Sequence, residues 1–128
     1  QPILPKDGFP SAVVGEWEGT RNDLQIAIEH AVGRPLQMCA CGRENPRKVA
    51  VMTGGAGSEV AKISDLGICS FVTGEGPHWS FIEAEERKMN VFYAGHYATE
   101  TFGVGALGEL VAEKFHLKAM FLERSGGL

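Results

Sequence analysis

Apolar residues recur along the chain with two different periods. Short apolar runs at residues 48–52, 68–72 and 89–93 are typical of buried strands, and each is followed by a loop that contains glycine. After the loops that follow the first two runs, two helices are expected, one ending near residue 67 and one over residues 81–88. Strands that alternate with helices in this way predict right-handed βαβ units. We therefore expect an α/β fold, with a mixed, largely parallel sheet and helices on both faces.

Two elements are predicted before these units. Prolines and a glycine within residues 1–11 indicate an irregular lead-in, after which alternation predicts a strand at residues 12–18. Asn22 can cap a helix over residues 23–32, and Gly33 can end it.

Three further elements complete the expected order. Residues 36–40 are predicted to form a strand, residues 97–115 a long helix and residues 117–122 a closing strand. The long helix carries an apolar stripe that consists of Val104, Leu107, Val111 and Phe115. We expect residues 1–128 to form a single α/β domain.

Composition narrows the class of partner. The chain is 44% hydrophobic and 22% charged, and no apolar run approaches the roughly 20 residues of a membrane span. The formal net charge is −4, and no cluster of lysine and arginine is present to displace phosphate counterions. We therefore expect small-molecule or protein partners, no nucleic acid and no membrane.

The three cysteines predict a reducing compartment. Cys39, Cys41 and Cys69 are odd in number and contain no CxxC pair, so neither a disulfide framework nor a zinc knuckle is indicated. Cys39 and Cys41 fall on one face of a predicted strand, where they act as small hydrophobic residues. The chain opens without a secretory leader, so we expect a cytoplasmic protein. It also opens without an initiator methionine, so we expect it to be a piece of a longer protein.

His96 and Glu100 are the first candidates for chemistry. They are four residues apart at the point where a strand leads into a helix, so they share one helix face. A nitrogen and an oxygen ligand suit divalent zinc, manganese, iron or cobalt better than calcium or magnesium. The alternative is that His96 bonds the start of the helix and Glu100 is a solvated carboxylate in its first turn.

Glu75 and His78 lie in the loop that follows the expected strand at residues 68–72, at the same edge of the sheet as His96. Beside a metal ion they could complete the ligands or act as catalytic residues that accept and donate protons. The glycine-rich loop at residues 53–58 could hold phosphate with its backbone N–H groups, although it lacks the lysine of a P-loop. A tight turn with Ser58 as a helix N-cap is the plainer explanation.

Three motifs together resemble a known family. They are Gly-Gly-Ala-Gly-Ser at residues 54–58, Thr-Gly-Glu at residues 73–75 followed by His78, and Gly-His-Tyr-Ala-Thr-Glu at residues 95–100. Their order and spacing are similar to those of the NGG-interacting factor three-like proteins, also called the GTP cyclohydrolase 1 type 2 family. The resemblance extends from about residue 14 to the C-terminus.

This resemblance implies two intertwined halves, of which the chain matches the C-terminal one, in a ring-shaped homohexamer with a dinuclear metal centre. It also implies that His96 and Glu100 are metal ligands, and that a histidine pair and an aspartate of the first half complete the centre. The chain contains no His-His pair, and Trp79 stands where members often carry a second histidine after the one matching His78.

The expected function follows from the resemblance. It implies part of a dinuclear metal-dependent hydrolase that acts on a nucleotide-like small molecule, with a metal-bound hydroxide as nucleophile, and a fragment that is inactive alone. The alternative is a non-catalytic oligomeric or protein-binding module of the same fold with an incomplete metal site. A phosphate-binding module that uses the glycine loop is a third option.

Overall fold

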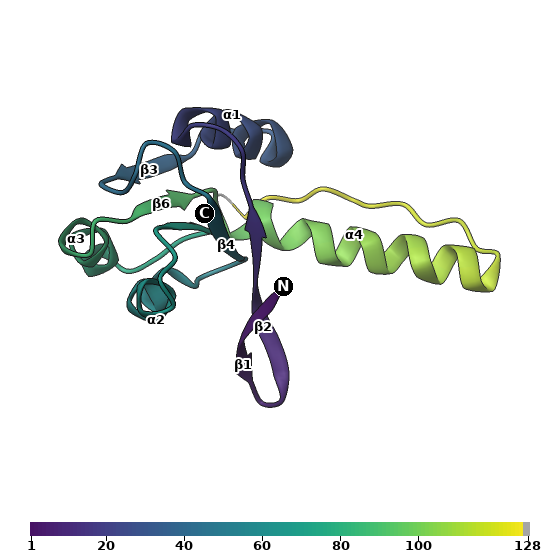
Figure 1. Ribbon diagram of the computed structural model, residues 1–128. Coiled ribbons are helices and arrows are strands. Elements are labelled where there is room, and N and C mark those ends of the chain that lie inside the picture. Colours follow the sequence, from purple (N-terminus) through teal and green to yellow (C-terminus); the bar gives the residue numbers. More distant parts are fainter. Residues whose placement is uncertain (127–128) are drawn as a thin grey trace.

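A six-stranded mixed sheet organises the computed structural model, which describes residues 1–126 (Figure 1). In spatial order its strands are β1 (Pro2–Lys6), β2 (Phe9–Glu16), β4 (Lys48–Met52), β5 (Ser70–Thr73), β6 (Asn90–Tyr93) and β3 (Gln37–Ala40). The central strands β4, β5 and β6 are parallel, whereas β1, β2 and β3 pair antiparallel at the two sides.

Helices cover both faces of this sheet. The covering elements are α1 (Arg21–Val32), the 3-10 turn η1 (Gly57–Glu59), α2 (Val60–Asp65) and α3 (His78–Glu86). A further helix, α4 (His96–Phe115), follows β6. Figure 1 shows α1 on one side of the sheet and α2 and α3 on the other. The predicted α/β architecture with a mixed sheet is confirmed.

Alternation along the strands explains the two layers. Ala50, Phe71 and Val91 are cross-strand neighbours and are buried in one cluster with residues of α2 and α3. Val72 and Phe92 point to the opposite face, where they pack with Leu24 of α1. Successive side chains of a strand face opposite sides, so each central strand contributes to both layers.

The first eleven residues form a β-hairpin, so the predicted irregular lead-in is wrong. Asp7 and Gly8 make a two-residue turn with φ of 51° and 85°, the left-handed conformation that tight hairpin turns require. Pro2 and Pro5 are tolerated because β1 is the edge strand of the sheet, where a missing N–H breaks no ladder on the open side. Pro10 lies in β2 but outside its stretch Val13–Glu16, which pairs with β4. Ile3 and Leu4 pack against the main core cluster, which anchors the hairpin.

The predicted closing strand at residues 117–122 is also wrong. His116 adopts a left-handed conformation that ends α4, and the N–H of Leu117 donates to the carbonyl of Ala112. The chain then runs back beside α4 without regular structure (Figure 1), and the N–H of Arg124 donates to the Tyr97 hydroxyl at 2.8 Å. This path keeps the segment away from either sheet edge.

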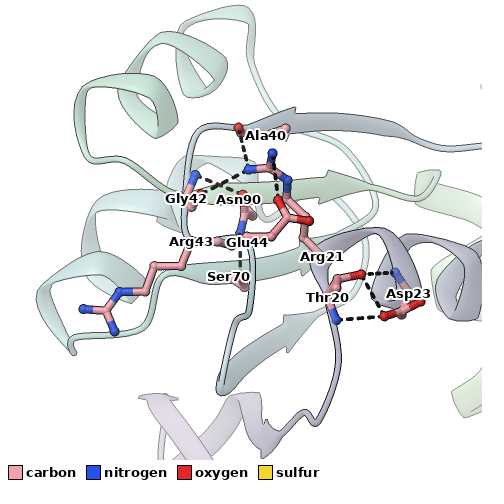
Figure 2. Close-up of polar contacts among 9 residues, drawn as sticks. All are labelled: Thr20, Arg21, Asp23, Ala40, Gly42, Arg43, Glu44, Ser70 and Asn90. Atoms are coloured by element: carbon pink, nitrogen blue, oxygen red, sulfur yellow. Dashed lines mark hydrogen bonds and ion pairs between the residues drawn. The ribbon is translucent and has the colours of Figure 1, made fainter.

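A buried asparagine organises the end of the sheet opposite the strand-to-helix loops (Figure 2). The Asn90 side chain donates to the carbonyl of Arg43 at 2.7 Å and to the Ser70 hydroxyl at 3.2 Å, and it accepts from the N–H of Gly42 at 2.9 Å. The nearby start of α1 is capped by Thr20, in a reciprocal box with Asp23, rather than by the predicted Asn22.

The long helix α4 projects from the body of the molecule (Figure 1). Its first turn reaches the sheet, where Thr99 is buried. Its predicted apolar stripe is exposed in this chain, with exposed fractions of 62% for Val104 and 60% for Leu107. None of the helices within residues 1–126 combines the length and the apolar content that crossing a membrane requires.

Candidate metal centre

The loops that follow β4, β5 and β6 meet at one edge of the sheet, as parallel strands predict. Backbone hydrogen bonds tie them together. The N–H groups of Gly74 and Glu75 both donate to the carbonyl of Gly54 at 3.0 Å, and the N–H of Gly95 donates to the carbonyl of Gly74 at 2.8 Å. The side chains on these loops are therefore held on a single braced platform.

Close backbone approach explains the glycines of this platform. Gly54 has φ of 70°, and a Cβ there would collide with the Glu100 carboxylate. A Cβ on Gly74 would lie 2.7 Å from the Gly54 carbonyl oxygen and from the Thr99 hydroxyl. Glycine at both positions lets the loop after β4 lie directly beneath the first turn of α4.

The same contacts argue against a phosphate site in the glycine loop at residues 53–58. The N–H of Gly54 already donates to the Thr99 hydroxyl at 3.0 Å, and the N–H of Gly57 donates to the carbonyl of Glu75 at 2.9 Å. Carboxylates of Glu75 and Glu100 flank the loop, and they would repel an anion. Ser58 lies within η1, so the expected N-cap at this residue is not formed.

His96, Glu75 and Glu100 form a row in which the imidazole is the middle member. His96 Nδ1 lies 2.9 Å from Glu75 Oε1, and His96 Nε2 lies 3.3 Å from Glu100 Oε1. The hydrogen bond to Glu75 raises the pKa of His96 above its ordinary value, and the charges of Glu100 and Glu75 act in the same direction, against an opposing effect of desolvation. All three side chains remain partly open to solvent.

The spacing of His96 and Glu100 fits two ligands of one divalent ion. Ligand bonds of about 2.1 Å at angles near 90° to 110° place two donor atoms about 3.0 to 3.4 Å apart, and the two atoms here are 3.3 Å apart. Glu75 faces the other ring nitrogen. Within residues 1–126, no three His, Cys, Asp or Glu side chains are grouped so that they could hold an ion. The described residues thus present two donor atoms at the spacing of metal ligands.

A cavity of about 710 Å³ opens beside this row. His78, the first residue of α3, lines it together with Glu75 and His96 but makes no hydrogen bond or ion pair within the described residues. The structure therefore places all four predicted site residues at one edge of the sheet, with Glu75, His96 and Glu100 in contact and His78 apart from them.

Several residues of the site were not predicted. Arg34 and Gln37 reach the cavity from the loop after α1 and from strand β3, and Tyr93 contributes its ring from β6. No local pattern marks these positions, because tertiary packing alone brings α1 and β3 to this edge. Thr99 could have been found from the sequence, because it lies on the helical turn between His96 and Glu100. Its hydroxyl accepts from the Gly54 N–H and donates to the Gly95 carbonyl, and so links the β4 loop to the first turn of α4.

Comparisons with known proteins agree with this fold. A sequence model of the Duf34/NIF3 (NGG1p interacting factor 3) family matches residues 7–126. A GTP cyclohydrolase 1 type 2 homolog of Pyrococcus abyssi is 40% identical over 131 residues, which cover 100% of this chain and 52% of that protein. A GTP cyclohydrolase 1 type 2 homolog of Archaeoglobus fulgidus is 36% identical over 130 residues, which cover 94% of this chain and 53% of that protein.

A solved structure also matches the fold of this chain. Protein ybgI, described as of unknown function, superposes with a TM-score of 0.87 at 30% identity, over 94% of this chain and 50% of that one. The chain spans about half the length of the curated relatives it matches. Since the family model covers nearly all of the described residues, the chain belongs to the Duf34/NIF3 (NGG1p interacting factor 3) family.

Proposed function

We propose that this chain contributes His96 and Glu100 to the metal centre of a hydrolase that acts on a nucleotide-like small molecule. The observation that carries the proposal is the 3.3 Å separation of His96 Nε2 and Glu100 Oε1 beside a large cavity. The mixed nitrogen and oxygen donors favour zinc, manganese, iron or cobalt. When bound, such an ion would supply Lewis-acid chemistry and activate water for attack near neutral pH.

The remaining ligands are proposed to come from the other half of a longer protein. The chain spans about half the length of its relatives, and the described residues offer two ligands where a catalytic centre ordinarily has three or more. A dinuclear centre, which the family resemblance implies, would need still more donors. We expect this chain to be inactive when it is alone.

The cavity supports a small-molecule substrate with an anionic group. Its volume is in the range of ligand sites, and among the side chains that the structure describes Arg34 is the only lysine or arginine that lines it. Within the described residues, the Arg34 guanidinium makes no hydrogen bond or ion pair, so its donors are available to a phosphate or carboxylate. Phe81 and Tyr93 stack at 5.9 Å on the wall and present apolar surface to a planar ring.

His78 is proposed to exchange a proton with the substrate. Its exposed imidazole lines the cavity and is not engaged by any described residue, so it is free to donate to a leaving group or accept from a nucleophile.

The test is hydrolysis of GTP by the intact natural protein. Curated relatives carry the name GTP cyclohydrolase 1 type 2 homolog, so GTP is the first substrate to offer, with ATP and other nucleoside triphosphates beside it. We expect turnover that chelation abolishes and divalent metal restores, and that His96→Ala removes. Arg34→Ala should raise KM more than it lowers kcat. Equal rates for the wild type and His96→Ala would refute the proposal.

One observation favours the non-catalytic alternative. The exposed apolar stripe of α4 is a surface that an oligomeric or protein-binding module would use. An intact protein that assembles normally, but turns over no nucleotide with any of the four metals, would support this alternative.

A further inference from the structure

The carboxylate of Glu75 is placed to determine which nitrogen of His96 is available. Its Oε1 lies 2.9 Å from Nδ1, while Glu100 Oε1 lies 3.3 Å from Nε2. A neutral imidazole carries one proton, and an ionised carboxylate can only accept. The two glutamates therefore compete for that proton, and the shorter contact favours its placement on Nδ1.

The backbone of Glu75 is fixed independently of its side chain. Its N–H donates to the carbonyl of Gly54 at 3.0 Å, and its carbonyl accepts from the N–H of Gly57 at 2.9 Å. Gly76 lies so close to Gly57 that a Cβ on either residue would collide with the other backbone. The carboxylate thus starts from a rigid loop, which is the condition for holding a partner ring in one orientation.

The floor beneath the imidazole is equally constrained. A Cβ on Gly55 would lie 3.4 Å from His96 Cε1 and 3.7 Å from Glu75 Oε1, so this backbone is packed against both side chains. His96 is the first residue of α4 and its own backbone is set by the helix. The ring is therefore held from below by Gly55 and from one side by Glu75.

We propose that Glu75 is a positioning residue that holds His96 in the Nδ1–H tautomer and so leaves the Nε2 lone pair for a metal ion shared with Glu100. This inference rests on the proposed metal-binding function of His96. It assigns Glu75 Oε1 to the imidazole, in place of the proton transfer that was expected of this residue. Without Glu75, the neutral imidazole would carry its proton on Nε2 and donate it to Glu100, so Nε2 would have no lone pair for the metal.

The tautomer can be measured without metal. We would record nitrogen-15 spectra of the histidine-labelled, metal-free intact protein at an alkaline pH where the imidazoles are neutral, with His96→Ala to assign the signal. The wild type should show the Nδ1–H form of His96, and Glu75→Gln, whose neutral amide is a weaker acceptor than a carboxylate, should retain less of it. Glu75→Ala should shift it toward the Nε2–H form. An Nε2–H form in the wild type would overturn the inference.

Zinc affinity provides the second readout. Residues that orient a metal ligand typically contribute 10- to 100-fold in affinity, so Glu75→Ala should bind Zn²⁺ about 10- to 100-fold more weakly than the wild type. Glu75→Gln should recover most of that loss. Glu86→Ala, which removes an equally exposed carboxylate from α3, is the matched control and should bind as the wild type does.

The outcomes are separable. Unchanged Zn²⁺ affinity in Glu75→Ala, together with lost affinity in His96→Ala, would refute the role of Glu75 and leave the metal centre intact. A wild type that binds no Zn²⁺ would overturn the proposed function, whereas the tautomer of the metal-free protein would still decide whether Glu75 sets the ring. Thermal unfolding of each variant verifies that the fold is retained.

Discussion

Gly54 shows how a single residue without a side chain shapes the candidate site. Its positive φ and its contact with the Glu100 carboxylate both exclude a larger residue. The glycine loop thus acts through close packing, since two of its N–H groups are already used inside the protein. It brings the β4 loop within reach of α4.

We predict that Gly54→Ala destabilises the protein and displaces Glu100. Alanine at a positive φ costs more than about 1 kcal/mol, and the collision with Glu100 adds to that cost. Urea unfolding measures the free energy, and metal content measures the site. Gly103→Ala is the control, because Gly103 lies exposed in α4 with open space around it and alanine there should stabilise the helix. Equal effects of the two substitutions would contradict the packing argument.

Cys39 and Cys41 differ in environment although they are two residues apart. Cys39 is buried in the core beneath α3, whereas Cys41 is exposed. Burial, with a further contribution from the hydrogen bond to Cys41, raises the pKa of the Cys39 thiol to about 12. The thiolate is the form that alkylating reagents attack.

We predict that iodoacetamide at about pH 8 modifies Cys41 and spares Cys39. A thiol with a pKa of about 12 holds roughly a thousandth of the thiolate present in an ordinary cysteine at that pH. Fragmentation mass spectrometry of the peptide that contains both cysteines reads the two sites separately. In urea, where burial is lost, both should react. Equal modification of both in the native protein would show that Cys39 is not buried.

At the scale of elements, Asn90 joins strand β6 to the loop before β4. Its amide satisfies three partners at the end of the sheet that is remote from His96 (Figure 2). Ser70 is buried and Gly42 is half-buried, so losing the amide leaves these two groups without that hydrogen bond, whereas Arg43 is exposed. The folding role of this network is separate from the chemistry of the opposite edge.

We predict that Asn90→Ala lowers the free energy of unfolding by about 2 to 3 kcal/mol, because it removes hydrogen bonds and leaves buried polar groups without a partner. The metal content of the folded variant should stay at the wild-type level. Chemical unfolding together with metal analysis tests both statements. A variant that loses its metal while its stability is unchanged would reverse the assignment.

The sequence predicted the elements whose pattern is local. The strand Lys48–Met52 has the predicted bounds, and the helices after β5 and β6 were found within a few residues of their true starts. The local pattern does not reveal the hairpin, because prolines disfavour strands and only the sheet shows that β1 is an edge strand. The segment 117–122 is apolar enough for a strand, but strand formation depends on an open partner, which a local pattern does not reveal.

The site was predictable to a similar degree. The spacing of His96 and Glu100 places them on one helix face, and the order of strands places Glu75 and His78 at the same edge. The contact of Glu75 with Nδ1 depends on how two loops brace each other, and Arg34 depends on the packing of α1. Neither is encoded in residue spacing.

At the scale of the molecule, α4 carries apolar surface with no partner among residues 1–126. The exposed large residues on it are Phe102, Val104, Leu107, Leu110, Val111 and Phe115. Large exposed apolar surface often marks an interaction site. The resemblance implies a homohexamer, so a second copy of the chain is the partner we propose.

We predict that the intact protein elutes as an oligomer, and that Leu107→Glu combined with Leu110→Glu lowers its mass. The two new carboxylates would have to be buried in the interface without partners, which weakens the assembly. Light scattering after size exclusion measures the mass, and Glu109→Gln on the same helix is the control. A monomeric wild type would contradict the hexamer, and an oligomer that withstands both charges would place the interface elsewhere.

The central claim is that His96 and Glu100 share a divalent ion. Elemental analysis of the purified intact protein, alongside the double variant His96→Ala, Glu100→Ala, tests it most directly. The account predicts stoichiometric zinc, manganese, iron or cobalt in the wild type and a loss of that metal in the folded double variant. A wild type without stoichiometric metal, or a double variant that retains the full amount, would contradict it.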